Sequence, residues 1–284
     1  MFARPAASSA AGRVRIRPRP SVQGGNKMSI DLDHARSFVM GLDLPAPRFG
    51  AAAAPSAPIN FDAARDQALV VGSEVVSFVQ GVTAEQRGDI VNSALLAQLR
   101  AKKVVPEPRS LVEIREWYNQ YFTVLGNIGF VTQQTNLQHY QEKSDGFQAH
   151  EAVLDVATTL LAGAPTALAV LASTVQALKK MDAGNPWVTI FNRESRSANT
   201  AHFQVSTVDR DPAGDLFVAL TAFALEAEQK ITQVLFFKFR KNEVRIENNA
   251  GKATINAAVL SGLRAQIAQK LLTQTSDFVS GLDI

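Results

Sequence analysis

The sequence predicts an α+β fold, with an N-terminal helical layer followed by an antiparallel β-meander or sandwich and a C-terminal helix. Two observations lead to this prediction. Between residues 61 and 183 apolar residues recur at intervals of three and four, the spacing of one face of an α-helix. After residue 184 the segments become shorter, the apolar spacing tightens and turn residues separate them, as in antiparallel strands. This segregation favours α+β over an alternating α/β fold.

Three regions follow from this pattern. They are a basic, Pro/Ala-rich tail and linker arm at 1–60, a helical region at 61–183, and an antiparallel β-sheet region with its closing helix at 184–284. Within the arm, a short helix is expected over residues 31–40. Phe38 and Phe49 are costly to leave in water, so we expect the arm to dock on a surface and to contribute to assembly.

The helical region carries two marked helix starts. Thr83 with Gln86, and Ser110 with Glu113, match the capping box, in which two side chains satisfy early backbone N–H groups. A pair of helices is expected at about 148–162 and 165–181, with a proline in the first turn of the second.

The sheet region is divided by turn residues. Residues 216–225 are apolar on both faces, which predicts a central strand covered on both sides. A last helix should begin after Asn256. The expected strands are 187–191, 202–208, 216–226, 231–240 and 243–247, with turns at 211–215, 241–242 and 248–251.

Composition limits the functional classes. The chain is 46% apolar and 19% charged, as in globular proteins, and it has no cysteine, which excludes disulfides, thiolate metal sites and cysteine nucleophiles. Of the 29 basic residues, six lie in the first 28 residues, where there is no acidic residue, so the body carries a net charge of −3. Nucleic acid is therefore an unexpected partner for the body and is conceivable only for the tail.

The location of the protein is open between the cytoplasm and export without an obvious secretory signal. The acid-free tail resembles a transit peptide in composition, but it also fits an extension ahead of Met28 or a disordered arm. We find no segment apolar enough to predict an ordinary transmembrane helix.

Catalytic signatures are not recognisable, so no catalytic residue is predicted and an enzyme is not favoured. Residues 209–214 match three positions of a calcium loop, with Asp209, Asp211 and Asp215 as the candidate ligands, but position 12 is Leu220. A hairpin turn is the simpler interpretation, and no cofactor other than calcium is considered. The polar loop at 192–199 offers a second candidate site, with Asn192, Arg193 and Arg196 as ligand contacts or as a solvated connection.

Residues 156–178 contain no charged side chain and are divided by Gly163 and Pro165. Each arm reaches at most about 20 Å as a helix, which is shorter than the hydrocarbon core of a bilayer. The pair could enter a membrane partway, as the hydrophobic hairpins of helical pore-forming toxins do, or it could be buried in the helical layer. The residues predicted to contact a membrane or partner are Leu160, Leu161, Leu168 and Leu171.

Aromatic and basic residues interleave near residue 240. Phe236, Lys238 and Arg240 share one face of the expected strand, where they would suit lipid headgroups, nucleic-acid bases or a protein partner, unless a further layer covers them. The acidic body argues against nucleic acid.

These features favour a non-enzymatic interaction or self-assembling protein whose partner is itself, as a homo-oligomer. Membrane lipid is a second expected partner, through the hairpin at 156–178. The alternative is a ligand- or metal-binding protein, hydrolytic activity included, that uses the loops at 192–199 and 209–215.

Overall fold

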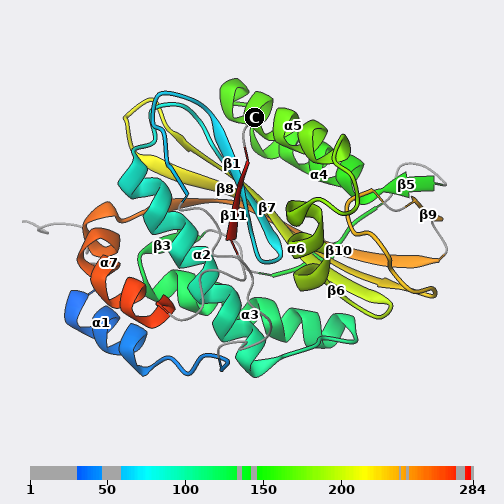
Figure 1. The fold of residues 1–284 in the computed structure, drawn as a ribbon, viewed down its shortest axis with the longest axis horizontal. Coiled ribbons are helices and arrows are strands. Elements are labelled where there is room, and N and C mark those ends of the chain that lie inside the picture. The colour runs from blue at the N-terminus through cyan, green and yellow to red at the C-terminus, as the bar shows by residue number, and fades with distance from the viewer. Residues whose placement is uncertain are drawn as a thin grey trace, which may run out of the picture.

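The computed structural model describes residues 31–46, 59–132, 136–141, 146–236, 238–240, 243–272 and 279–282. A mixed sheet runs through the molecule in the order β11-β1-β2-β7-β8-β10-β3, with β4 paired to β10 and β6 paired to β7 (Figure 1). The described strands of this sheet are β1 Gln67–Val71, β2 Glu74–Phe78, β3 Phe130–Thr132, β4 Gln138–His139, β6 Arg196–Ser197, β7 Thr200–Arg210, β8 Leu216–Ala227, β10 Val244–Ile255 and β11 Val279–Leu282.

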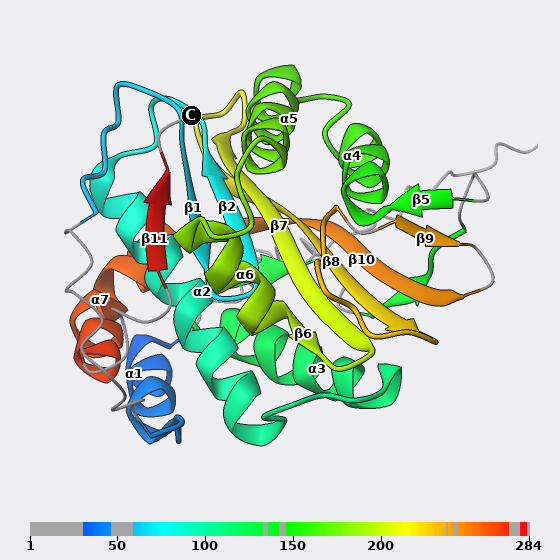
Figure 2. The same ribbon diagram turned by 45° about the vertical axis from the view of Figure 1, so that its right-hand side comes forward.

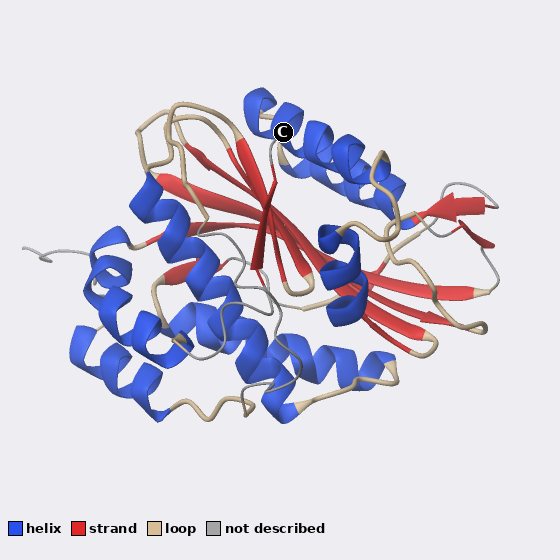
Figure 3. Cartoon of the chain, in the orientation of Figure 1, coloured by secondary structure: helices blue, strands red, loops and turns tan. Residues whose placement is uncertain are grey.

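Most neighbouring strands are antiparallel, and β2 and β7 form a parallel pair in which Glu74 lies opposite Gln204. A separate two-stranded sheet joins β5 (Gly146–Gln148) to β9 (Lys238–Arg240). The predicted α+β class is confirmed, although the sheet is mixed rather than antiparallel throughout, and helices cover both of its faces (Figure 3).

Helices form two layers. One layer contains α1 (Leu32–Gly41), α2 (Ala84–Val104), α3 (Leu111–Asn127) and α7 (Ala257–Leu271). The other contains α4 (Ala149–Leu160), α5 (Pro165–Lys179) and α6 (Pro186–Ser195) (Figure 2). Each layer has its own apolar core against the sheet, and we call these the first core, under α2 and α3, and the second core, under α4 and α5.

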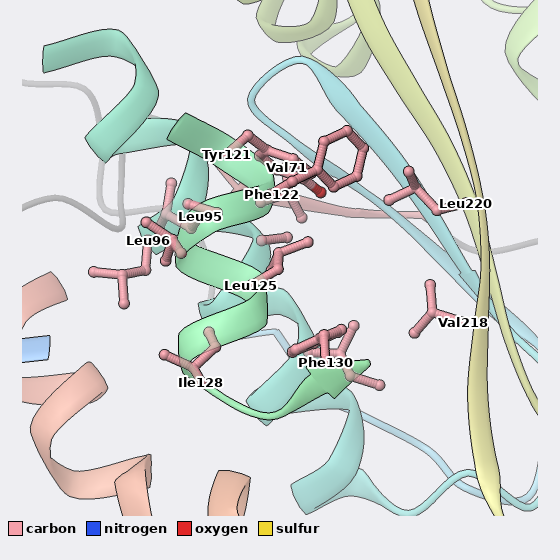
Figure 4. Packing of buried hydrophobic residues seen from close by; sticks show 14 of the residues in the cluster. Val71, Leu95, Leu96, Tyr121, Phe122, Leu125, Ile128, Phe130, Val218 and Leu220 are labelled. Carbon is pink, nitrogen blue, oxygen red and sulfur yellow. The ribbon is translucent and has the colours of Figure 1, made fainter. Parts of the chain in front are cut away.

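Strand β8 links the two cores. Its residues alternate between them: Val218 and Leu220 enter the first core, whereas Phe217 and Phe223 enter the second. Figure 4 shows Val218 and Leu220 facing side chains of the first core, including Leu125 of α3. The prediction of a central strand covered on both sides is confirmed, because a strand buried on both faces is apolar throughout.

The predicted helix starts are confirmed, with one difference in the hydrogen bonds of the second capping box. Thr83 and Gln86 form a complete capping box at α2. At α3 the Ser110 hydroxyl accepts a hydrogen bond from Glu113 N at 3.2 Å, but the Glu113 carboxylate accepts from Arg109 N. Asn256 caps α7 by accepting from Val259 N.

Two predictions about secondary structure were wrong, one at residues 67–78 and one at residues 187–191. Residues 67–78 lie in the expected helical region but form the hairpin β1–β2, which turns at Gly72 with a φ of 56°. The second was expected as a strand but lies in α6, because Asn185 caps the helix and Pro186 occupies its first turn.

Two further expectations near the C-terminal part were wrong. Of the expected strand at 231–240 only Lys238–Arg240 forms β9, and residues 231–236 pack as a loop on the second core. The expected turn at 248–251 lies inside β10, which pairs along its length with β8. All four residues of the expected turn pair with β8, from Asn248 opposite Phe223 to Gly251 opposite Leu220, so the long partner strand keeps them in the sheet.

The expected helix at 31–40 is confirmed as α1, and it docks on the same chain. Leu32 packs against Gly262 of α7, and Phe38 is partly buried on the first core. The first core therefore shields part of the Phe38 side chain from water without a second molecule. Phe49 lies outside the described residues.

Candidate functional site

The uncharged segment 156–178 forms most of the helical hairpin α4–α5 on the second face of the sheet. Helix α5 lies over β2 and β7, and α4 lies over β8 and β10. Leu161 and Leu171 are fully buried against the sheet, while Leu160 and Leu168 are half-buried at the edge of the second core. The four predicted contact leucines are therefore on the sheet side of the hairpin in this state.

Between residues 156 and 178 the outer face of the hairpin carries no charge either, although α4 contains exposed Glu151 and half-buried Asp155 ahead of this segment. Its exposed residues are small or weakly polar: Thr158, Thr159, Ala162, Gly163, Pro165, Thr166, Ala169, Ser173 and Gln176. A helix at the surface of a globular protein ordinarily presents charged side chains to water. Here charges appear only at the two ends of the segment, at Asp155 and Lys179.

The hairpin is too short to cross a bilayer as it stands. Helix α4 has 12 residues and α5 has 15, so they extend about 18 and 22 Å at 1.5 Å per residue, compared with about 30 Å for the hydrocarbon core. Across the part of the chain that the structure describes, no helix combines the length and hydropathy of a membrane span.

A second predicted segment lies beside the base of the hairpin. The backbone N–H of His150, in the first turn of α4, donates to the carbonyl of Leu235, and the His150 ring lies 5.2 Å from the ring of Phe236. Phe236 is partly buried on the second core, whereas Lys238 and Arg240 are exposed on β9. The fold thus brings two basic side chains next to the amino-terminal end of α4, where Glu151 is exposed and Arg240 pairs with Glu243 at 3.6 Å.

The three candidate calcium ligands do not converge. Asp211 Oδ1 accepts hydrogen bonds from the backbone N–H groups of Ala213 and Asp215, both at 2.9 Å, and Asp209 Oδ1 accepts from Arg210 N. Among the described residues, no group of three or more histidine or acidic side chains could hold a metal ion. Residues 211–215 form the hairpin turn between β7 and β8, which was the simpler interpretation of the sequence, and the Asp211 carboxylate accepts hydrogen bonds within the turn itself.

A pocket of about 390 Å³ lies where α2, α3 and α6 meet the start of β7. Arg193 and Arg196, two of the three predicted loop residues, line it. Asn192 does not, and its side chain instead accepts a hydrogen bond from Val234 N at 3.1 Å. Residues 192 and 193 point in different directions because they lie on α6, where successive side chains are about 100° apart.

The charged wall of the pocket centres on Glu194. Its side chain is 5% exposed, it accepts from Arg193 Nε at 2.8 Å, and it forms an ion pair with Lys102 of α2. Two cations therefore share one buried carboxylate. The floor opposite is formed by Trp117 of α3 and His202 of β7, whose ring centroids are 4.4 Å apart.

His202 is neutral at physiological pH. Burial of the ring, and secondly the positive charge of Lys102, lower the pKa of His202 to about 3. The sequence analysis did not single out this residue, yet a signal was present. His202, Gln204 and Ser206 alternate with apolar residues, so one face of a buried strand is polar.

A buried polar network continues from the pocket along that face. Ser73 donates from its backbone N–H to Gln98 Oε1 at 2.9 Å, and Gln98 Nε2 lies 3.4 Å from Glu74 Oε2. Glu74 also accepts from Ser206 Oγ at 2.7 Å and from the Tyr121 hydroxyl at 2.8 Å. Burial raises the pKa of Glu74 despite these hydrogen bonds.

Comparison with known proteins gives distant similarities only. No protein-family model matches the chain, and no curated protein matches it. A solved structure of a delta-endotoxin has 13% sequence identity and a TM-score of 0.37, covering 78% of this chain and 96% of its own. A solved structure of the Evf virulence factor has 12% identity and a TM-score of 0.30, covering 89% of this chain and 91% of its own. Both TM-scores are below 0.5, so neither similarity assigns a function to this chain.

Proposed function

We propose that this protein is membrane-active and that the α4–α5 hairpin is the part that enters lipid. The observation that supports the proposal is that both faces of the hairpin lack charge between Val156 and Leu178. A charged side chain near the centre of a bilayer costs about 2.5–3.5 kcal/mol on insertion scales, so the absence of charge removes the main barrier to entry.

The sheet-facing side of the hairpin suits the same role. Leu161 and Leu171 are buried in the second core, and a hydrocarbon environment would replace the sheet as their apolar surroundings if the hairpin swung away. The short helices then favour partial insertion by a single copy, and a pore would need several copies. Self-association remains part of the proposal for this reason.

The basic residues at the base of the hairpin support a first encounter with anionic lipid. Lys238 and Arg240 are exposed on β9, although Arg240 also pairs with Glu243, and a basic side chain near an anionic surface contributes about 1 kcal/mol of attraction. This attraction would bring the amino-terminal end of α4 to the surface before any helix leaves the sheet.

The test is dye release from vesicles that contain anionic phospholipid. Thr166→Asp and Ala169→Asp place a charge on the exposed face of α5, where it should not disturb folding. We expect each variant to keep the thermal melt of the parent and to release dye at a rate at least about tenfold lower, given the cost of a charge in lipid. Thr123→Asp, at an exposed position of α3 in the other helical layer, is the matched control and should release dye as the parent does.

Two results would contradict the proposal. The first is a parent protein that neither binds nor permeabilises anionic vesicles. The second is dye release by Thr166→Asp and Ala169→Asp at the parental rate. Leu171→Asp is not a useful variant, because Leu171 is 1% exposed and its replacement should unfold the protein.

A further inference from the structure

The 390 Å³ pocket lies outside the hairpin, and its position follows from the register of the sheet. Strand β2 pairs with β7 from Gln204 onward, and β6 pairs with β7 at Thr200 and Ala201. His202 lies between these two pairings, at a gap in the edge of the sheet. We propose that the pocket binds an uncharged sugar through its hydroxyl groups, independently of any action on membranes.

Two nearly buried side chains at the floor of the pocket carry polar atoms that have no partner. His202 is 5% exposed and Trp117 is 3% exposed. Within the described part of the chain, neither ring nitrogen of His202 nor Nε1 of Trp117 takes part in a hydrogen bond. A neutral imidazole offers one donor and one acceptor, an indole offers one donor, and buried polar groups are ordinarily paired. Two hydroxyl groups of one ligand, each both donor and acceptor, would satisfy all three atoms.

The charged side chains of the pocket already pair within the protein. Lys102 and Arg193 both pair with Glu194, and Glu107 pairs with Arg109. An anionic ligand would have to compete with Glu194 for these cations. A hydroxyl group can accept from a cation and donate to a carboxylate without separating the pair. The ion pairs therefore favour an uncharged ligand.

Polar side chains continue around the walls. Ser73 and Gln98 line the side toward β2, and Ser197 and Arg196 line the side toward α6. Among the described residues the Ser197 hydroxyl has no hydrogen-bond partner, and Arg196 donates only through Nη1, to two carbonyls at 231–232. The volume of about 390 Å³ lies at the lower end of small-molecule sites, which are about 300–1,000 Å³. A sugar carries hydroxyl groups around a compact uncharged ring, which matches polar groups on several sides of a small pocket.

Methyl glycosides are the probes, and the indole N–H resonance of Trp117 is the readout. The chain has two tryptophans, and Trp187 lies in the second core on the other face of the sheet, so Trp187→Phe assigns the two indole signals in proton–nitrogen correlation NMR. The probes are the methyl pyranosides of glucose, galactose, mannose and N-acetylglucosamine, at up to tens of millimolar. We expect at least one of them to shift the Trp117 signal saturably and to raise the Tm, while the Trp187 signal stays in place.

Two further additions define what the pocket takes. The free monosaccharides separate two sources of the sugar: binding of a methyl glycoside, whose anomeric oxygen is blocked as in a glycan, indicates a terminal sugar unit, and binding of the free form alone indicates a soluble sugar. Inorganic phosphate at the same pH should bind more weakly than the best sugar, because an anion competes with Glu194.

Variants test whether the unpaired groups hold the sugar. Ser197→Ala removes a half-buried hydroxyl that bonds to no described residue, so the fold should persist and binding should weaken about threefold or more. His202→Phe keeps a ring against Trp117 but removes both nitrogens, and it should weaken binding about tenfold or more. Arg245→Gln, which removes an 80% exposed arginine of β10, is the control and should bind as the parent does.

The proposal is overturned if none of these sugars, free or methylated, changes the Trp117 signal or the Tm. It is also overturned if inorganic phosphate binds more tightly than every sugar. A third contrary result is that Ser197→Ala and His202→Phe, shown to be folded by circular dichroism, bind like the Arg245→Gln control. None of these outcomes depends on vesicle permeabilisation.

Discussion

Replacing His202 with phenylalanine should make the protein less sensitive to acid. The ring is buried against Trp117, and its pKa is lowered to about 3 by burial and by the charge of Lys102. In the unfolded chain the imidazole regains a pKa of about 6.5. Between these two values the unfolded state binds one proton more than the folded state, so the free energy of unfolding decreases as the pH decreases.

The magnitude follows from the two pKa values. One pKa unit corresponds to about 1.4 kcal/mol, so lowering the pH from about 8 to about 5 should remove about 2 kcal/mol of stability through His202 alone. Phenylalanine cannot be protonated and can keep the ring contact with Trp117. The His202→Phe protein should therefore lose about 2 kcal/mol less than the parent over the same interval.

Urea denaturation at a series of pH values, followed by far-UV circular dichroism, measures this difference. His139→Gln removes an exposed histidine of β4 and serves as the control, which should follow the parent. If His202→Phe and the parent lose the same free energy of unfolding between pH 8 and pH 5, the assignment of His202 as a buried neutral group is refuted.

Two other replacements test the buried polar network beside the pocket. Burial raises the pKa of Glu74, so the parent loses free energy of unfolding as the pH rises and this carboxyl ionises. In urea titrations, Glu74→Gln should therefore gain stability relative to the parent at alkaline pH. A Glu74→Gln protein that is even less stable than the parent at alkaline pH than at acidic pH would contradict this. Gly72→Ala should lower the free energy of unfolding by about 2 kcal/mol or more, because φ at this residue is 56° and the new Cβ would lie 2.4 Å from Gln98 Oε1. An unchanged urea midpoint would contradict this expectation and show that the turn adapts.

The sequence was most informative where one physical requirement dominates a segment. Residues 216–225 are apolar at every position except Thr221, because β8 is covered on both faces. Asn256 ahead of α7 was equally readable, because the capping hydrogen bond is local and needs only the next three residues.

The sequence was least informative where a segment packs against partners that are distant along the chain. The β1–β2 hairpin is buried at all ten strand positions, so neither the period of a strand nor that of a helix is visible in it. At 187–191 an apolar run with two aromatic residues suggested a strand, although the preceding Asn185 and Pro186 were the better guide to a helix.

The pocket could be predicted only in part, because it is assembled from four separate segments. Arg193 and Arg196 were identified from their polar surroundings, whereas Lys102 and Trp117 lie in helices whose patterns indicated only packing and solvation. The hairpin was identified from sequence because the absence of charge is visible without a structure. Its exposed uncharged face became apparent only when the direction of each side chain was known.

The parallel pairing of β2 with β7 has a consequence for the order in which the chain can fold during synthesis. Glu74 and its partner Gln204 are separated by about 130 residues, which a ribosome takes on the order of 10 s to add. Throughout that interval the emerging β1–β2 hairpin presents an apolar edge that has no native partner, and such an edge is prone to pair with other chains. Nascent chains arrested before β7 should therefore depend on chaperones to stay dispersed, and those arrested after β8 should need them far less.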